Sequence, residues 1–189
     1  GIEKKLQMQA LTENQMRDFV CGYLSEQGEE LLKQLSGRLR ELGETPLLLM
    51  MLCSVFKANQ NKVPSNLGSV FRRFTEIYDN KLKEDIPVTD ESRFWWKRLL
   101  QHLAWVMTHG ESKTEISVAI PMQKARDILT KFLKEQDYHQ PRDAEKWLDD
   151  LLKHHLIQLS AENQIEFLHQ LLQEYYAAER LLAELPKLS

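Results

Sequence analysis

The stretch IEFLHQLLQEYYAAERLL, residues 165–182, places a histidine where a short alternating segment passes into an amphipathic helix. A histidine at such a position can pack in the core, bind a metal ion or donate a hydrogen bond to an anion. His169 and Tyr176 fall at the margin of the apolar face that helical spacing predicts. There, His169 either presents a ring nitrogen to a neighbouring surface or is satisfied by a nearby backbone carbonyl. The residues predicted to face inward are Leu168, Leu171, Leu172, Tyr175, Ala178, Leu182 and Leu185.

The histidines of the chain do not form a metal-site pattern. None of them stands at a ligand spacing from a cysteine or a carboxylate. His154 and His155 are adjacent and point to different sides of a helix, and we expect both to be solvated residues favoured by the C-terminal dipole. No metal site is therefore predicted. The six histidines are His102, His109, His139, His154, His155 and His169.

The sequence also has no pattern for catalysis by this chain alone. It contains no Gly-rich phosphate loop, no nucleophile elbow, and no serine or cysteine in a recognisable base-paired motif. Its two cysteines, Cys21 and Cys53, lie in apolar helical patterns, as is usual for reduced core thiols of a cytosolic protein. We therefore expect a cytoplasmic protein with no catalytic residues and no cofactor bound by this chain alone.

The composition is that of a globular protein, with 42% hydrophobic and 28% charged residues among 189. The net charge of -3 does not mark the whole chain as a nucleic-acid binder. The longest apolar run, residues 47–56, is about half the roughly 20 residues of a membrane span, so none is predicted. The chain begins with Gly1 inside a polar–apolar pattern, and we expect it to be part of a longer protein.

Two helices are predicted before the first strongly apolar segment. The first begins at Thr12, which forms a capping box with Gln15 three positions later. The second covers residues 29–42 and ends at Gly43, where glycine can take the left-handed cap conformation.

Two further helices complete the first half. Pro46 suits a first helical turn, because its missing N–H has no partner there. The helix that it begins is apolar nearly all round, so we expect it to be the central buried helix. The next helix is capped by Ser65 or Asn66 and runs to about Leu82. The acidic, proline-containing stretch at 83–92 then predicts a boundary between two units.

The second half predicts three helices, a β-hairpin and a returning helix, an order typical of a winged helix. The hairpin is formed by residues 156–160 and 165–169 around a polar turn. The predicted fold class is therefore mainly α: a four-helix domain at 1–85 is followed by a winged-helix domain with a small β-hairpin at 86–189. The helices preceding the hairpin cover about 92–109, a segment that begins at Pro121, and a segment capped by Asp143.

Winged helices often bind DNA, but the charges here argue against it. The helix before the hairpin is mainly acidic, and the hairpin turn adds glutamates without an arginine. Such a surface does not neutralise phosphate charge, which drives non-specific binding to DNA. We therefore predict no DNA binding. The residues concerned are Asp143, Glu145, Asp149, Asp150, Glu162 and Glu166, against Lys146 and Lys153.

Three motifs carry a family resemblance. FLHQLLQEYYAA (167–178) closely resembles the FxHxxxQEYxAA pattern that ends the winged-helix domain of NACHT proteins, which are STAND-class signalling NTPases that include NOD-like receptors and bacterial relatives. ETPLLLMMLC (44–53) is similar to the NPLLLxxLC start of a helix in their first helical domain, and LTENQMRDFV (11–20) resembles the entry into that domain. The motifs follow the family order. Thr45 replaces a common asparagine, Leu171-Leu172 replaces a frequent Thr-Phe, and the Walker A, Walker B and sensor residues are absent.

The resemblance implies a regulatory role in signalling for innate immunity or bacterial defence. ADP or ATP would be held by a P-loop domain upstream of this chain, with Pro46 packed near the adenine and His169 reaching the β-phosphate of ADP. Rotation of the winged helix, hinged near 83–90, would convert the closed ADP form to an open, homo-oligomerising ATP form and signal to a downstream sensor or repeat domain. The alternative is a helical protein-interaction module with a degenerate winged helix and no nucleotide; a DNA-binding winged helix is third.

Overall fold

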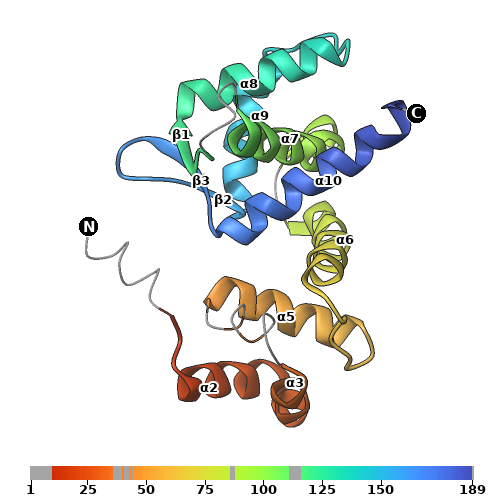
Figure 1. Ribbon diagram of the computed structural model, residues 1–189, viewed down its shortest axis with the longest axis vertical. Helices are drawn as coiled ribbons and strands as arrows, with labels where there is room; N and C mark the ends of the chain where they lie inside the picture. The colour runs from red at the N-terminus through yellow and green to blue at the C-terminus, as the bar shows by residue number, and fades with distance from the viewer. Residues whose placement is uncertain are drawn as a thin grey trace. The chain divides into compact units, whose positions relative to one another are not determined.

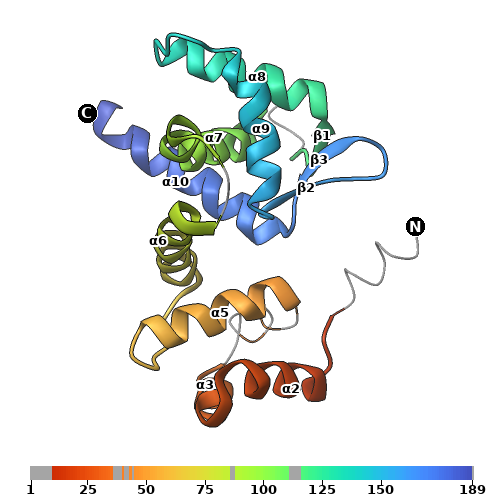
Figure 2. The same ribbon diagram turned by 180° about the vertical axis from the view of Figure 1, so that it is seen from behind.

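The computed structural model describes residues 10–35, 40, 43, 45–85, 88–110 and 116–188. These residues are mainly helical with one small antiparallel sheet, as Figures 1 and 2 show. The mainly α fold class predicted from the sequence is therefore confirmed. The chain divides into two compact units, Gly1–Lys81 and Leu82–Ser189.

Helix α2 (Glu13–Leu24) begins with the predicted capping box. The Gln15 N–H donates to Oγ1 of Thr12 over 3.2 Å, and the Thr12 N–H donates to Oε1 of Gln15 over 2.9 Å. These bonds satisfy backbone donors that the start of a helix leaves without partners, so this prediction is confirmed. The chain continues through the 3-10 turn η1 (Ser25–Gln27) into α3 (Gly28–Gln34).

The end of this region differs from the prediction. The sequence predicts a helix that reaches residue 42, whereas α3 ends at Gln34. Gly43 is helical and its φ lies outside the left-handed region, so the predicted left-handed cap is wrong. A Cβ added to Gly43 would meet Met16 and Leu49 at ordinary contact distances of 3.4 and 3.5 Å, so the residue occupies a packed position rather than a turn.

Helix α5 (Pro46–Ala58) is the buried helix of the first unit, as predicted. Pro46 stands in its first turn, where its fixed φ suits the helix and its missing N–H costs nothing. Burial raises the pKa of the Cys53 thiol to about 12, so this thiol stays protonated and unreactive. Buried residues lie all round the helix: Leu48, Leu49, Met51, Leu52, Cys53, Val55 and Phe56.

Helix α6 (Leu67–Asp85) is capped by Asn66. Its Oδ1 accepts a hydrogen bond from the Ser69 N–H over 2.9 Å, which decides between the two predicted caps. Val70, Phe71 and Phe74 supply its buried apolar side. The division between the two units falls within α6, shortly before the domain boundary predicted after residue 85.

The second unit contains the sheet. The predicted hairpin is present, and β1 adds a third strand against β3, which pairs Ile120 with Ile165 and gives the antiparallel order β1-β3-β2. In Figures 1 and 2, α10 lies along α7. The elements are α7 (Asp90–His109), β1 (Ala119–Pro121), α8 (Met122–Glu135), α9 (Asp143–Lys153), β2 (Ile157–Leu159), β3 (Gln164–Phe167) and α10 (Gln170–Leu188).

One local prediction for this unit is wrong. Asp143 does not cap α9: Arg142 holds the cap position without a side-chain hydrogen bond, and Asp143 is the first helical residue. The Asp143 carboxylate instead accepts from the hydroxyl of Tyr138 over 3.4 Å. Strand β1 covers only Ala119–Pro121, and the apolar side chains of Ile116 and Val118 shortly before it are exposed.

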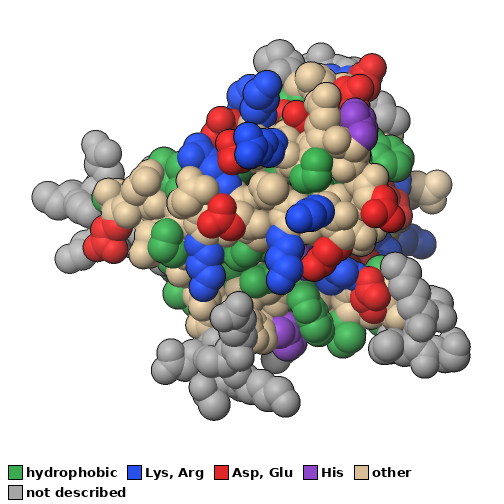
Figure 3. Space-filling view, turned by 90° about the horizontal axis from the view of Figure 1, so that it is seen from above, with side chains coloured by type: hydrophobic (Ala, Val, Ile, Leu, Met, Phe, Trp, Pro, Cys, Tyr) green, Lys and Arg blue, Asp and Glu red, His purple; other side chains and the backbone are tan. Residues whose placement is uncertain are grey.

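Charges of both signs share one face of the molecule. On the face drawn in Figure 3, the described lysines and arginines are interspersed with aspartates and glutamates. Such mixing keeps the potential of one sign from building up over that face.

Within the described residues, no helix combines the length and the apolar character that crossing a membrane requires.

His154 is a core residue, against the prediction that it is solvated. Its side chain is only 2% exposed, whereas His155 is exposed. The His154 ring packs against Trp96 with the ring centres 5.4 Å apart. Burial lowers the pKa of His154 to about 4, while Asp150 opposes this and His155 and Lys153 add to it.

We expect the second unit to lose stability as the pH falls from about 6.5 to about 4. In that range the unfolded chain binds a proton at residue 154 and the folded chain does not, so protonation favours unfolding by up to about 3 kcal/mol. Substitution His154→Phe should reduce this loss, measured by urea unfolding at a series of pH values. The same substitution at exposed His139 is the control, and an equal pH dependence in both variants would show that His154 is not responsible.

Candidate functional site

His169 caps helix α10. The Leu171 N–H donates to Nδ1 of His169 over 3.0 Å. The backbone carbonyl of His169 accepts from the N–H groups of Leu172 and Gln173 over 3.1 and 3.3 Å. One residue therefore satisfies three donors at the start of the helix, as an asparagine or aspartate cap would. The ring is held by a backbone N–H and not by a backbone carbonyl, which was the alternative to a nitrogen exposed to a neighbouring surface.

This bond also fixes the protonation of the ring. A nitrogen that accepts a hydrogen bond carries no proton, so the neutral imidazole has its proton on Nε2. Burial lowers the pKa of His169, with Glu174 opposing it, and this keeps the ring neutral at pH 7. Within the described residues, no acceptor is bonded to Nε2. The Nε2–H is therefore a donor that can bind a phosphate or carboxylate oxygen next to a helix N-terminus, where negative charge is favoured.

Gln173 anchors the helix that His169 begins. Its side chain is 2% exposed, and its Nε2 donates to Oγ1 of Thr108 and to the carbonyl of Ser117, both over 3.1 Å. These bonds tie α10 to the last turn of α7 and to the segment that leads into β1. The apolar pattern of the sequence predicts no role for Gln173. The feature of the sequence that could have indicated its burial is the position of this polar residue directly after Leu172 and three residues before Tyr176.

The buried face of α10 is not the predicted one. Tyr176, predicted at the margin, is 1% exposed, whereas Leu182, predicted inward, is 50% exposed. Ala178 is also exposed. The buried side passes through Leu172, Gln173 and Tyr176, so the helix is turned by about one residue from the apolar stripe. Counting apolar residues misses this, because a hydrogen-bonded glutamine lies on the buried side.

Pro46 and His169 both stand at helix starts, but in different units. Pro46 is exposed at the first turn of α5, and its preceding residue Thr45 makes no side-chain capping bond. Both positions suit a ligand that lies at a helix N-terminus. The nucleotide cleft that the resemblance implies for the two residues stays a prediction.

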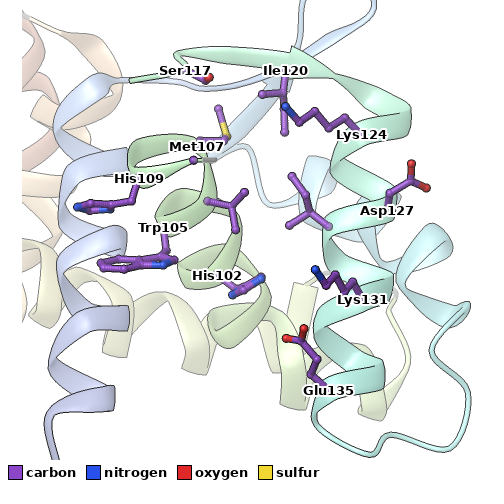
Figure 4. Close-up of a pocket in the computed structure, with 13 residues that line it drawn as sticks. His102, Trp105, Met107, His109, Ser117, Ile120, Lys124, Asp127, Lys131 and Glu135 are labelled. Atoms are coloured by element: carbon purple, nitrogen blue, oxygen red, sulfur yellow. The ribbon is translucent and has the colours of Figure 1, made fainter. Parts of the chain in front are cut away.

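A cavity of about 650 Å³ lies between α7 and α8 in the second unit (Figure 4). Its wall includes His102, whose ring stacks on Phe132 with centres 4.4 Å apart and whose Nδ1 is buried without a hydrogen-bond partner in the described residues. Burial lowers the pKa of His102 to about 4, so the ring is neutral and can accept a hydrogen bond. The lining of the cavity also includes Trp105, Met107, Ile120, Lys124, Asp127 and Lys131.

The cavity adjoins the anchor of α10, because Ser117 both lines it and accepts from Gln173. The apolar and aromatic part of its wall suits a compact apolar group, and His102 can orient that group if it carries a donor. The described residues contain no group of three or more histidine, cysteine, aspartate or glutamate side chains that would hold a metal ion.

No protein-family model matches the chain, and no curated protein matches it either. The resemblance to NACHT proteins therefore rests on the three sequence motifs.

We expect Gln173→Ala to lower the free energy of unfolding of the second unit by about 2 kcal/mol. The change removes two hydrogen bonds and leaves the Ser117 carbonyl without that donor. Urea unfolding followed by tryptophan fluorescence measures the loss. The control is Gln170→Ala on the exposed side of the same helix, for which we expect a change below about 0.5 kcal/mol. Equal losses would show that the two bonds do not stabilise the unit.

Proposed function

We propose that this chain is the regulatory part of a NACHT-type signalling NTPase. Its helical and winged-helix domains close over ADP or ATP that a P-loop domain outside this chain holds. The observation that carries the proposal is the cap at His169: Nδ1 accepts from Leu171, so the Nε2–H remains for a phosphate oxygen. The order of the three motifs supports the same assignment.

The order of elements in the second unit supports a winged-helix domain. Helices α7, α8 and α9 precede a hairpin, β1 lies between the first two helices, and all three strands form one sheet in the order β1-β3-β2. A small sheet that joins a hairpin to a strand between helices is the arrangement expected of a winged helix. In this proposal, Pro46 packs near the adenine from the helical domain.

The proposed contact has the strength that a switch needs. A hydrogen bond between an N–H and a charged phosphate contributes about 1.5–3 kcal/mol, and a bias of 1.4 kcal/mol changes a two-state equilibrium tenfold. The contact forms only while the β-phosphate is in place beneath the winged helix. In this proposal, the position of the domain therefore depends on whether a nucleotide with a β-phosphate is bound.

We expect His169→Ala and His169→Asn to release ADP about tenfold faster from the protein that contains both the P-loop domain and this chain. Alanine removes the cap and the donor, whereas asparagine keeps a cap and its shorter side chain does not extend a donor as far. The second unit should lose about 1 kcal/mol of stability with alanine and little with asparagine. Stopped-flow displacement of fluorescent ADP and urea unfolding measure the two effects. Unchanged ADP release in both variants would leave His169 as a helix cap only.

We also expect this chain by itself to bind ADP no more tightly than millimolar. It has no Gly-rich phosphate loop, and that loop supplies most contacts to the phosphates in P-loop proteins. Isothermal titration of the chain with ADP tests this, with adenosine as the control for contacts to the base. Micromolar affinity for ADP would place a complete nucleotide site within these 189 residues and contradict the proposed division of roles.

A further inference from the structure

A second pocket in the same unit, of about 240 Å³, has a different chemistry from the cavity beside His102. It lies between α7, α8 and α10, and two arginines from different helices enter it. We call it the arginine pocket. Its lining includes Arg98 and Gln101 of α7, Phe132 of α8, Gln136 after α8, and Arg180 and Glu184 of α10.

Both guanidinium groups of the arginine pocket lie against the same aromatic ring. Their central carbons are 5.9 Å (Arg98) and 5.8 Å (Arg180) from the centre of the Phe132 ring. Arg98 also lies over Trp95, 4.4 Å from the ring centre. The rings attract the cations but accept no conventional hydrogen bond from their N–H edges. These edges remain able to bind an oxyanion.

In the described part of the chain, few of these N–H donors have an acceptor. Arg98 donates from Nη2 to Oε1 of Gln136 over 2.6 Å, and Arg180 donates from Nη1 to Glu184. The Nε of Arg180 is buried and has no acceptor among the described residues. A guanidinium has five N–H donors in a planar fork, and a buried donor without an acceptor is costly. The pocket therefore has guanidinium N–H donors that can bind one further acceptor.

The charges that line the arginine pocket also favour binding of an anion. Burial and the nearby Arg180 lower the pKa of Arg98, as expected for two like charges close together. Arg180 likewise helps to lower the pKa of His102, whose ring stacks on Phe132. Two guanidinium groups face one lining carboxylate, that of Glu184, so a single added negative charge brings the pocket to neutrality.

An exposed phenylalanine stands beside the pocket. Phe94 is 70% exposed and lies four residues before Arg98 on α7, which puts the two side chains on the same face of the helix. Its ring contacts Trp95 edge to face, with centres 5.6 Å apart. An exposed aromatic side chain next to an arginine is a combination that is enriched where proteins bind one another.

We propose that Phe94, Arg98 and Arg180 form a docking surface for a protein segment that inserts one aspartate or glutamate into the arginine pocket and packs an apolar side chain on Phe94. The net positive charge of the lining favours a carboxylate, because one monoanion neutralises it. The exposed ring of Phe94 favours a segment that has an apolar side chain near its acidic residue. This surface does not depend on the proposed nucleotide role. Arg180 lies 11 residues beyond His169, about 16 Å along α10.

Peptide selection tests the proposal. A phage-displayed library of random dodecapeptides is selected on the immobilised chain and counter-selected on the variant Arg98→Gln/Arg180→Gln. Enriched peptides should share an acidic residue with an apolar residue nearby. Enrichment of peptides without an acidic residue, or no enrichment over the double variant, would overturn the proposal.

Calorimetry with a synthetic enriched peptide then assigns the contacts. We expect Arg98→Gln, Arg180→Gln and Phe94→Ala each to weaken binding at least tenfold, as should replacing the acidic residue of the peptide by its amide. Lys134→Gln removes the same charge from an exposed site outside the pocket and should leave affinity unchanged. Arg98 is exposed, so its variant remains informative if Arg180→Gln does not fold. Equal weakening by Lys134→Gln, or competition by millimolar inorganic phosphate but not by acetate, would overturn the proposal.

Discussion

The hydrogen bond from the Leu171 N–H to Nδ1 of His169 determines the properties of the candidate site. It lies between the end of strand β3 and the start of helix α10, and it orients the imidazole. Because Nδ1 is the acceptor, the neutral ring must carry its proton on Nε2. Protonation of Nδ1 would break the cap, so the structural bond and the lowered pKa both favour a neutral ring. A single short contact thus sets the conformation, the tautomer and the charge of this residue.

Helix α10 carries three functions at successive positions. His169 begins it, Gln173 fastens it to Thr108 and Ser117, and Arg180 reaches the arginine pocket beside α7 and α8. The hydrogen bonds of Gln173 resist rotation of the helix about its axis, and rotation would move both His169 and Arg180. The buried glutamine is therefore important for both proposed sites although it belongs to neither.

Burial lowers the pKa of three histidines of the second unit, with different consequences. His154 packs on Trp96 and serves the core, whereas His102 stacks on Phe132 between the cavity and the arginine pocket. Of the three, only His169 caps a helix, and its Nε2–H has no acceptor in the described residues. A lowered pKa by itself therefore does not identify a functional histidine here; the hydrogen bonds around each ring separate their roles.

The sequence by itself determined the features that depend on neighbours a few residues apart. The capping box of Thr12 and Gln15, the start of α5 at Pro46 and the hairpin of β2 and β3 each follow from local bonds and spacing. Only the tertiary structure decided that β1 joins the hairpin, that His154 is buried, and that Tyr176 rather than Leu182 faces the core. These outcomes depend on which distant side chains compete for the same space and hydrogen bonds. A periodic pattern gives a helix its apolar side, but the partner helix and buried polar residues such as Gln173 fix its rotation.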